Sequence, residues 1–297
     1  MTAPAIGTVG LFGNPDKREI GEAIATARAM VEAAGRTLLV PRCLAPYLPD
    51  LGEGIDHETL AQQADVIIAF GGDGTMLRAA RSIGETGTPL LGINLGSLGY
   101  LTDIPLPELP QALEQLFAGE WEPTRRERVE AVVLRDRHEQ ARLRALNDIV
   151  INMGPLPRAL DMELRLDRSA LGRFLGDGLI VSTATGSTAY NLSAGGPIVH
   201  PAVKGFLITP ICPHSLAVRP ILVPDEMTVE LRLHEVGQGA TLTADGQAAT
   251  SLAAGDRVQF RTAADPVFLV KFPNSDFFRA MRRKLQWGAI KRRRARS

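Results

Sequence analysis

The feature that most constrains the fold is an apolar run that ends in a glycine-rich loop. The run Asp65 to Phe70 reads Asp-Val-Ile-Ile-Ala-Phe, a pattern typical of a strand buried on both faces of a parallel sheet. The loop 71–75, Gly-Gly-Asp-Gly-Thr, follows it directly, and a helix is expected from Thr75 to about Ser82. Open α/β sheets bind their ligands where such strands end and helices begin, so this loop is a candidate binding site.

Strands and helices alternate through the first part of the chain. The apolar runs Ile6 to Phe12 and Pro89 to Ile93 predict two further strands. Apolar residues at 3.6-residue spacing predict a helix from Ile20 to Ala34 and another from Leu109 to Phe117. Strands that alternate with helices favour a parallel sheet with helices on both faces. We therefore predict a Rossmann-like α/β nucleotide-binding domain over residues 1–125.

The pattern changes after about Arg125. Short segments then alternate apolar and polar residues, as Val229, Leu231 and Leu233 do, and turns rich in Gly, Pro and Asp separate them. We predict an all-β domain, a sandwich or barrel-like stack, over residues 126–274. Its expected strands are Val129–Leu134, Leu143–Asn152, Met162–Asp167, Thr228–His234, Arg257–Arg261 and Val267–Phe272.

Helical spacing returns from Phe277 to Trp287. A late helix that follows an all-β block is expected to pack back onto the first domain, which residues 275–297 would then complete. The segment from Arg279 to Ser297 holds nine basic residues and no acidic one. We interpret this basic tail as a solvated surface, because no recognisable nucleic-acid-binding module lies near it.

Composition excludes several classes of protein. The 297 residues are 45% apolar and carry 33 Lys+Arg against 33 Asp+Glu, which excludes collagen-like, disordered and coiled-coil chains. No apolar run approaches the roughly 18 residues of a membrane span, so no membrane partner is expected. Cys43 and Cys212 do not form a metal-binding spacing, and Cys212 is expected to be buried. So few cysteines favour a reducing, cytoplasmic location.

The loop 71–75 has the chemistry of a phosphate site. Its glycines let a polyphosphate approach the backbone, and the N–H groups at the start of the following helix favour negative charge. Asp73 is the loop's single ionisable side chain and could accept a hydroxyl proton or orient a metal-bound water. A simpler interpretation is a tight turn in which Asp73 caps the helix. The sequence has no P-loop and no GxGxxG motif.

A second candidate region follows the predicted strand Leu179 to Val181. Residues 182–196 are rich in hydroxyl side chains and small residues and include one aromatic residue, Tyr190. Such a segment can hydrogen-bond a ribose and stack a base on the tyrosine ring. An ordinary loop rich in Ser and Thr would have the same composition, so this alternative stays open.

Six segments, taken together and in this order, resemble the NAD kinase (ATP-NAD kinase) family. The resemblance extends from about Ile6 to the helix predicted at Phe277 to Trp287, and it implies phosphorylation of the 2′-hydroxyl of the adenosine ribose of NAD by ATP. The motifs are residues 71–75 (GGDGT), 146–148 (LND), 177–179 (DGL), 185–197 (TGSTAYNLSAGGP), 213–220 (PHSLAVRP) and 245–247 (DGQ).

The resemblance also implies roles for single residues. Asp73 would be the catalytic carboxylate, and Asp148 stands where a longer Glu is commoner. The divalent cation, Mg²⁺ or Mn²⁺, is expected to be held by the ATP triphosphate, with no metal ligand predicted in the chain. The expected nucleotide contacts are Gly71, Gly72, Asp73, Gly74, Thr75, Asn147, Asp148, Arg158, Asp177, Thr188, Ala189, Tyr190, Asn191, Leu192, Ser193 and Gln247.

Other functions are compatible with parts of this pattern. The resemblance implies NAD and ATP as substrates and a homodimer or homotetramer joined partly through the β domains. The GGDGT motif by itself is shared with kinases that act on lipid or sugar hydroxyls, such as diacylglycerol and sphingoid-base kinases. A non-catalytic nucleotide-binding regulator is a third possibility, but it would be expected to have lost Asp73.

Overall fold

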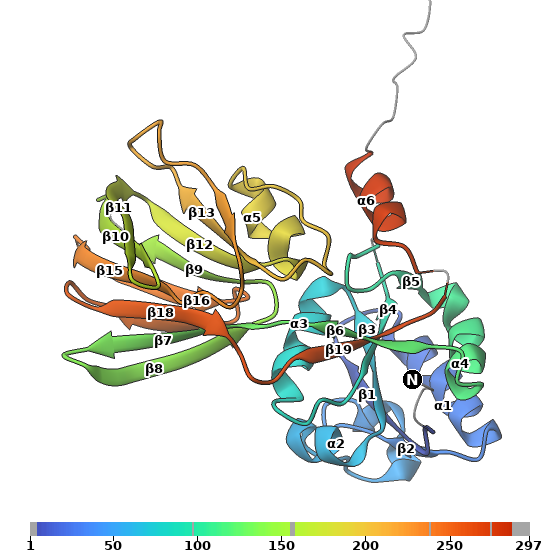
Figure 1. The fold of residues 1–297 in the computed structure, drawn as a ribbon. Coiled ribbons are helices and arrows are strands. Elements are labelled where there is room, and N and C mark those ends of the chain that lie inside the picture. The colour runs from blue at the N-terminus through green and yellow to red at the C-terminus, as the bar shows by residue number, and fades with distance from the viewer. Residues whose placement is uncertain (1–4, 97, 155–157, 238, 274, 287–297) are drawn as a thin grey trace, which may run out of the picture. The chain divides into compact units, whose positions relative to one another are not determined.

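A computed structural model describes residues 5–96, 98–154, 158–237, 239–273 and 275–286. Their contacts divide the chain into two units: residues 1–124 together with 269–297 form the first, and residues 125–268 form the second. The first unit is α/β and the second is all-β (Figure 1), so the predicted fold class is confirmed. In the described ranges, no helix combines the length and the apolar character needed to cross a bilayer.

The first unit is built on a seven-stranded sheet. Its strand order is β2-β1-β3-β4-β19-β6, with β5 paired to β4. The pairings among β1 to β5 and between β4 and β19 are parallel. The strands are β1 (Thr8–Gly13), β2 (Thr37–Leu39), β3 (Val66–Gly71), β4 (Leu90–Asn94), β5 (Ile104–Pro105), β6 (Glu122–Arg126) and β19 (Val267–Lys271); the helices are α1 (Ile20–Ala33), α2 (His57–Gln63), α3 (Asp73–Ser82), α4 (Leu109–Phe117) and α6 (Phe277–Leu285).

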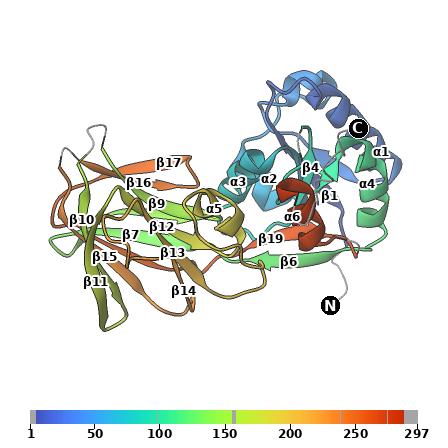
Figure 2. The same ribbon diagram turned by 90° about the horizontal axis from the view of Figure 1, so that it is seen from above.

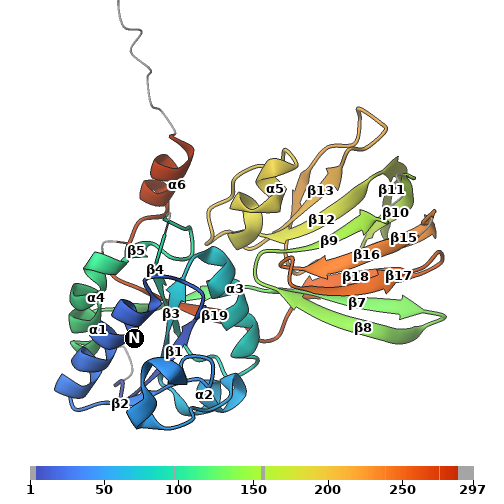
Figure 3. The same cartoon turned by 180° about the vertical axis from the view of Figure 1, so that it is seen from behind.

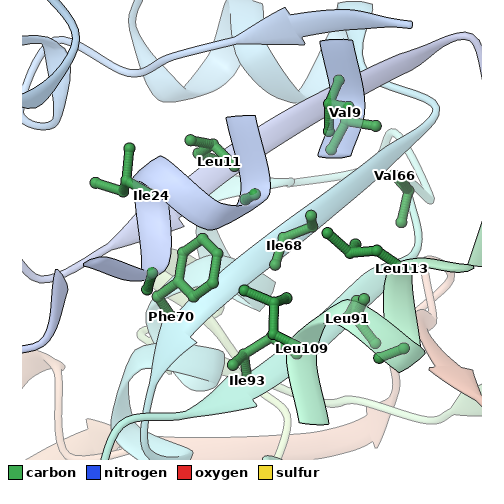
Figure 4. Packing of buried hydrophobic residues seen from close by; sticks show 14 of the residues in the cluster. Val9, Leu11, Ile24, Val66, Ile68, Phe70, Leu91, Ile93, Leu109 and Leu113 are labelled. Atoms are coloured by element: carbon green, nitrogen blue, oxygen red, sulfur yellow. The ribbon is translucent and has the colours of Figure 1, made fainter. Parts of the chain in front are cut away.

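Helices bury both faces of the central strand β3. Alternate residues of this strand, such as Ile68 and Phe70, pack in one cluster with Ile24 of α1 and Leu109 of α4 (Figure 4). On the other face, α2 and α3 lie against the sheet, and all six residues of β3 are buried. The continuous apolar run arises because each residue of the strand meets either α1 and α4 or α2 and α3.

The second unit is a sandwich of two six-stranded antiparallel sheets (Figures 2 and 3). The sheet orders are β11-β10-β15-β18-β7-β8 and β14-β13-β12-β9-β16-β17. Alternate residues of both sheets form one core, for example Ala131 and Ile151. The strands are β7 (Val129–Arg135), β8 (His138–Ala145), β9 (Asp148–Met153), β10 (Leu160–Leu166), β11 (Ser169–Gly176), β12 (Gly178–Thr183), β13 (Phe206–Ile211), β14 (Ile221–Val223), β15 (Val229–Glu235), β16 (Ala240–Ala244), β17 (Ala248–Leu252) and β18 (Arg257–Thr262).

Three expectations need correction. The strand predicted at Val267–Phe272 belongs to the parallel sheet of the first unit and not to the all-β domain, because an apolar run does not reveal which sheet it will join. The single strand predicted at Leu143–Asn152 is two strands, β8 and β9, separated by a bend at residues 146 and 147. Cys212 is exposed rather than buried. Residues 287–297 of the basic tail lie outside the described residues.

Candidate functional site

The loop 71–75 joins strand β3 to helix α3. The helix begins at Asp73, and Gly72 is its N-cap residue with no side-chain cap. The Asp73 carboxylate accepts backbone N–H groups of residues 100–102, so the interpretation of this residue as a simple helix cap is wrong. Its carboxylate turns instead to a neighbouring loop, residues 98–102.

Three successive backbone N–H groups hold the Asp73 carboxylate. Tyr100 donates to Oδ2 at 2.9 Å, Leu101 donates to Oδ1 at 2.9 Å, and Thr102 donates to Oδ1 at 3.2 Å. A carboxylate bound in this way has a fixed orientation, and its position at the first turn of a helix is electrostatically favourable. The side chain is nevertheless 28% exposed, so a ligand can reach it.

Asn94 and Gly99 shape the loop that supplies these donors. Asn94 ends strand β4 and is buried; its amide donates to Thr102 Oγ1 at 2.9 Å and accepts the N–H of Gly96 at 2.6 Å. A Cβ atom at Gly99 would lie 1.9 Å from Asp73 Oδ1, so a larger residue would displace the carboxylate. Sequence reasoning missed both residues as parts of the site, although the repeated glycines at 96 and 99 were a signal.

The glycines of the loop 71–75 differ in what they contact. A Cβ atom at Gly71 would lie 2.2 Å from Thr75 Oγ1, so this glycine permits tight packing of the turn. At Gly72 and Gly74, nothing lies within 4 Å of the position of a Cβ atom. There is therefore space beside these two residues, as a phosphate-contacting loop requires.

A second aspartate organises the candidate ribose site of the second unit. Asp245 lies in the turn of the β16–β17 hairpin with a positive φ of 50°. Its carboxylate accepts the N–H groups of Leu146, Asn147 and Asp148 at 2.9, 2.8 and 3.3 Å. Asp245 thus sets the backbone of the predicted Asn147 and Asp148 pair, and Gln247 belongs to the same turn. The motif Asp-Gly-Gln was the sequence signal for this turn.

Burial changes the acidity of Asp148. Its side chain is almost fully enclosed, and burial together with the nearby charge of Asp245 raises the pKa of Asp148 to about 7. A hydrogen bond from the backbone of Tyr190 acts in the opposite direction. Both effects that raise the pKa penalise the charged carboxylate. Asp148 therefore changes charge near neutral pH, where an ordinary aspartate is fully ionised.

The segment after strand β12 packs against Asn147. It forms the short helices η4 (Thr185–Thr188) and α5 (Tyr190–Ser193). Ser182 Oγ donates to the carbonyl of Asn147 at 3.1 Å, and a Cβ atom at Gly186 would lie 2.1 Å from the same oxygen. The structure therefore brings residues 188–193 to the same end of the sheet as Asn147 and Asp148.

Two residues of this segment have different environments. Asn191 is fully buried: its amide donates to the carbonyls of Ser187 and Pro197, and its oxygen accepts the Thr209 hydroxyl. Its side chain therefore holds the segment in place and has no exposed surface for a nucleotide. Tyr190 is 42% exposed, so its ring is accessible for stacking.

Asp177 and Arg158 lie at the opposite end of the sheet. The carbonyl of Asp177 accepts the N–H of Met153, the last residue of β9, and Arg158 packs against Gly237. Asp148 begins β9. At about 3.3 Å per residue, the two ends of this strand are separated by about 17 Å. The predicted nucleotide contacts of the second unit thus form two separate groups.

Across residues 5–96, 98–154, 158–237, 239–273 and 275–286, no group of three or more His, Cys, Asp or Glu side chains could hold a metal ion.

Two protein-family models match the chain. The ATP-NAD kinase N-terminal domain matches residues 53–121, which include the loop 71–75. The ATP-NAD kinase C-terminal domain matches residues 146–272, which include Asn147, Asp148 and Asp245. Both organised loops described above therefore fall within the matched regions.

Curated relatives and solved structures agree with these models. The NAD kinase of Syntrophotalea carbinolica is 42% identical over 90% of this chain and 95% of its own length, and that of Geobacter sulfurreducens is 44% identical over 88% and 91%. Yeast NADH kinase, solved in complex with NADH, has a TM-score of 0.89 at 25% identity and covers 97% of this chain and 90% of its own. An NAD kinase from Archaeoglobus fulgidus, solved in complex with ATP, has a TM-score of 0.72 at 25% identity over 94% and 98%. The chain belongs to the ATP-NAD kinase family, whose enzymes phosphorylate NAD at the expense of ATP.

Proposed function

We propose that the chain transfers the γ-phosphoryl group of ATP to the 2′-hydroxyl of the adenosine ribose of NAD and so makes NADP. The observation that carries this proposal is the Asp73 carboxylate, fixed by three backbone N–H groups beside an open glycine loop. The ligands of the two solved neighbours, NADH and ATP, support the choice of substrates. No observation favours a lipid or sugar substrate or a non-catalytic regulator.

Asp73 is proposed as the general base. Its Oδ1 accepts two backbone N–H groups, whereas Oδ2 accepts one, from Tyr100. The second contact of Oδ2 is the more distant Lys284 ammonium, at 3.4 Å, so a substrate hydroxyl can take that place on Oδ2. As the ribose oxygen bonds to the γ-phosphorus, the hydroxyl proton passes to Oδ2. The bond between the γ-phosphorus and the β–γ bridging oxygen breaks, and ADP leaves with that electron pair. Positioning provides most of the catalysis in such a transfer.

Asn147 and Asp148 are proposed to hold the ribose, and Tyr190 is proposed to stack on the adenine. Hydrogen bonds to Asp245 fix the backbone of Asn147 and Asp148, so the side chains of these two residues are presented on a fixed loop. An ionised carboxylate accepts hydrogen bonds from sugar hydroxyls. Asp148 is one methylene shorter than glutamate, and its position beside the backbone N–H of Tyr190 keeps it close to the proposed base-stacking residue.

The divalent cation is proposed to arrive as part of the ATP substrate. The described residues offer no carboxylate cage for it, and Mg²⁺ commonly keeps substrate phosphates among its ligands. Bound to the triphosphate, it would neutralise charge that develops on the phosphoryl oxygens. We also propose a cytoplasmic location, which fits the two free and exposed thiols of Cys43 and Cys212.

A homodimer or homotetramer is proposed as the working form. The two groups of predicted contacts lie at the ends of β9, separated by about 17 Å along the strand. One adenosine cannot contact both groups. In an oligomer, the Asp177 end of one copy could serve the nucleotide held by Asn147 of another.

Replacing Asp73 tests its role as the base. Asp73→Asn and Asp73→Ala should lower kcat by about 10²- to 10⁴-fold, because proton acceptance is lost, while the KM for NAD changes little. Asp73→Ala is included because the asparagine amide would place an N–H group opposite the donors of residues 100–102. Circular dichroism and calorimetric NAD titration check folding and binding. A kcat near that of the unmodified enzyme in either folded variant would refute the assignment.

Removing divalent cations tests the proposed substrate complex. EDTA in excess over total metal should abolish NADP formation, and added Mg²⁺ or Mn²⁺ should restore it. Binding of NAD without ATP, measured by calorimetry, should be unaffected by EDTA, since the cation is proposed to enter with the triphosphate. Loss of NAD binding in EDTA would contradict the proposal that the cation enters only with ATP.

The raised pKa of Asp148 predicts a pH-dependent affinity for NAD. Because the charged form accepts the ribose hydroxyls, the Kd for NAD should fall by about tenfold from pH 6 to pH 8 as this group ionises around its pKa of about 7. Asp148→Asn should bind NAD weakly with no pH dependence over this range. Calorimetric titration at several pH values measures both. An identical pH dependence in the two proteins would show that another group is responsible.

Measurement of the molecular mass and complementation between variants test the proposed homodimer or homotetramer. Light scattering should give two or four times the chain mass of 32.0 kDa. Asp73→Ala and Asp177→Ala proteins, each weakly active alone, should regain activity after mixing and subunit exchange, because some sites then combine an intact Asp73 with an intact Asp177. A mass of one chain, or no gain on mixing, would argue that each copy works alone.

A further inference from the structure

A lysine of the last helix lies against the proposed base. Helix α6 belongs to the first unit, like Asp73. The Nζ atom of Lys284 lies 3.4 Å from Asp73 Oδ2 and 4.5 Å from the centre of the Tyr100 ring. None of the sequence motifs described above includes this lysine.

Packing sets the position of this helix. The Phe277 ring lies 6.3 Å from the Tyr100 ring, and Ala280 is buried. Asp276 caps the helix by accepting the N–H of Phe278 at 2.9 Å. Tyr100 thus connects Asp73 to helix α6. Its backbone N–H donates to Asp73, and its ring lies against Phe277 and Lys284 of the helix. Lys284 is therefore directed toward the carboxylate by the fold.

The geometry leaves the ammonium group able to serve a second acceptor. An ammonium has three donors, and the 3.4 Å distance to Asp73 is longer than the ~2.8 Å of a short N⁺–H···O⁻ bond. The Tyr100 ring face attracts a cation. Burial and the charge of Asp73 raise the pKa of the Tyr100 hydroxyl, which keeps the ring neutral. The Lys284 ammonium can therefore give up its contact with Oδ2 while its contact with the Tyr100 ring keeps it near Asp73.

Oδ2 is also the atom proposed to receive the substrate hydroxyl. A hydroxyl that enters there would take the place now held by Lys284. The side chain of Lys284 is 30% exposed, so it has room to move toward an incoming phosphate. A positive charge next to Asp73 would also reduce the repulsion between this carboxylate and the triphosphate, which is the electrostatic problem of placing a carboxylate at a phosphoryl-transfer site.

We propose that Lys284 is a catalytic residue that donates a hydrogen bond to the transferred γ-phosphoryl group. The inference rests on the proposed role of Asp73. In the structure Lys284 pairs with Asp73; when the hydroxyl occupies Oδ2, the ammonium turns to a γ-phosphoryl oxygen. It moves no proton and stabilises the charge on the phosphoryl oxygens in the transition state.

Three variants test this role. Lys284→Met should lower kcat by about 10²-fold, the usual effect of losing one donor to a transition-state oxygen, with little change in the KM for NAD or ATP. Lys284→Arg keeps the charge and should recover much of the lost kcat. Arg283→Met removes a neighbouring charge of the same helix and should leave kcat within about twofold, as for most surface substitutions. Thermal unfolding should show equal stability of all three.

Four outcomes would overturn the proposal. These are a normal kcat in Lys284→Met, an equal loss in Arg283→Met, no recovery in Lys284→Arg, or an effect confined to the KM for ATP. Comparison with Asp73→Ala distinguishes a failure of the role proposed for Asp73 from a failure of the role proposed for Lys284. If Asp73→Ala keeps its kcat, the role of Asp73 itself fails; if Asp73→Ala is inactive while Lys284→Met is normal, only the lysine assignment fails.

Discussion

The hydrogen bonds between the Asp73 carboxylate and three successive backbone N–H groups are the constraint on which the first unit's site depends. They tie the start of helix α3 to the loop that follows strand β4, so that the ends of two neighbouring parallel strands act as one structure. A carboxylate on a mobile loop would sample many orientations, and a base must lie within hydrogen-bond distance of its proton. Here the backbone, rather than another side chain, provides the orientation. Gly99 is required because no Cβ atom fits beside Asp73 Oδ1.

In the second unit, too, an aspartate carboxylate accepts three successive backbone N–H groups, but with a different consequence. Asp245 also collects three successive N–H groups, those of residues 146–148. Three consecutive N–H groups that point to one anion form a concave site that suits a carboxylate. In the first unit the carboxylate is proposed to react, and the backbone positions it. In the second unit the carboxylate positions the backbone, and the neighbouring side chains are proposed to bind.

The sequence was sufficient for the fold class, because the run at residues 65–70 requires burial on both faces and the period-two segments after Arg125 require a sheet with one buried face. It was not sufficient for strand β19, whose apolar residues fit either sheet until tertiary contacts select the parallel one. For the site, local motifs identified the loops that carry Asp73, Asn147 and Asp148. They could not reveal that Asn94, Gly99 and Lys284 belong with Asp73, since these residues are brought together by strand order and helix packing across up to 211 positions of the chain. They also could not show that Asp177 lies a strand length away from Asp148.

The pKa of Asp148 would link its ionisation to the proposed binding of NAD. Burial and the charge of Asp245 both favour the neutral carboxyl group of Asp148 in the free protein. Ribose hydroxyls that donate to this group would favour its charged form, so bound NAD would lower the pKa of Asp148. The two effects are reciprocal, because a ligand that binds the ionised form more tightly must release the proton to the same extent. Asp245 therefore influences the second unit in two ways: its hydrogen bonds fix the loop, and its charge adds to the effect of burial in raising the pKa of Asp148.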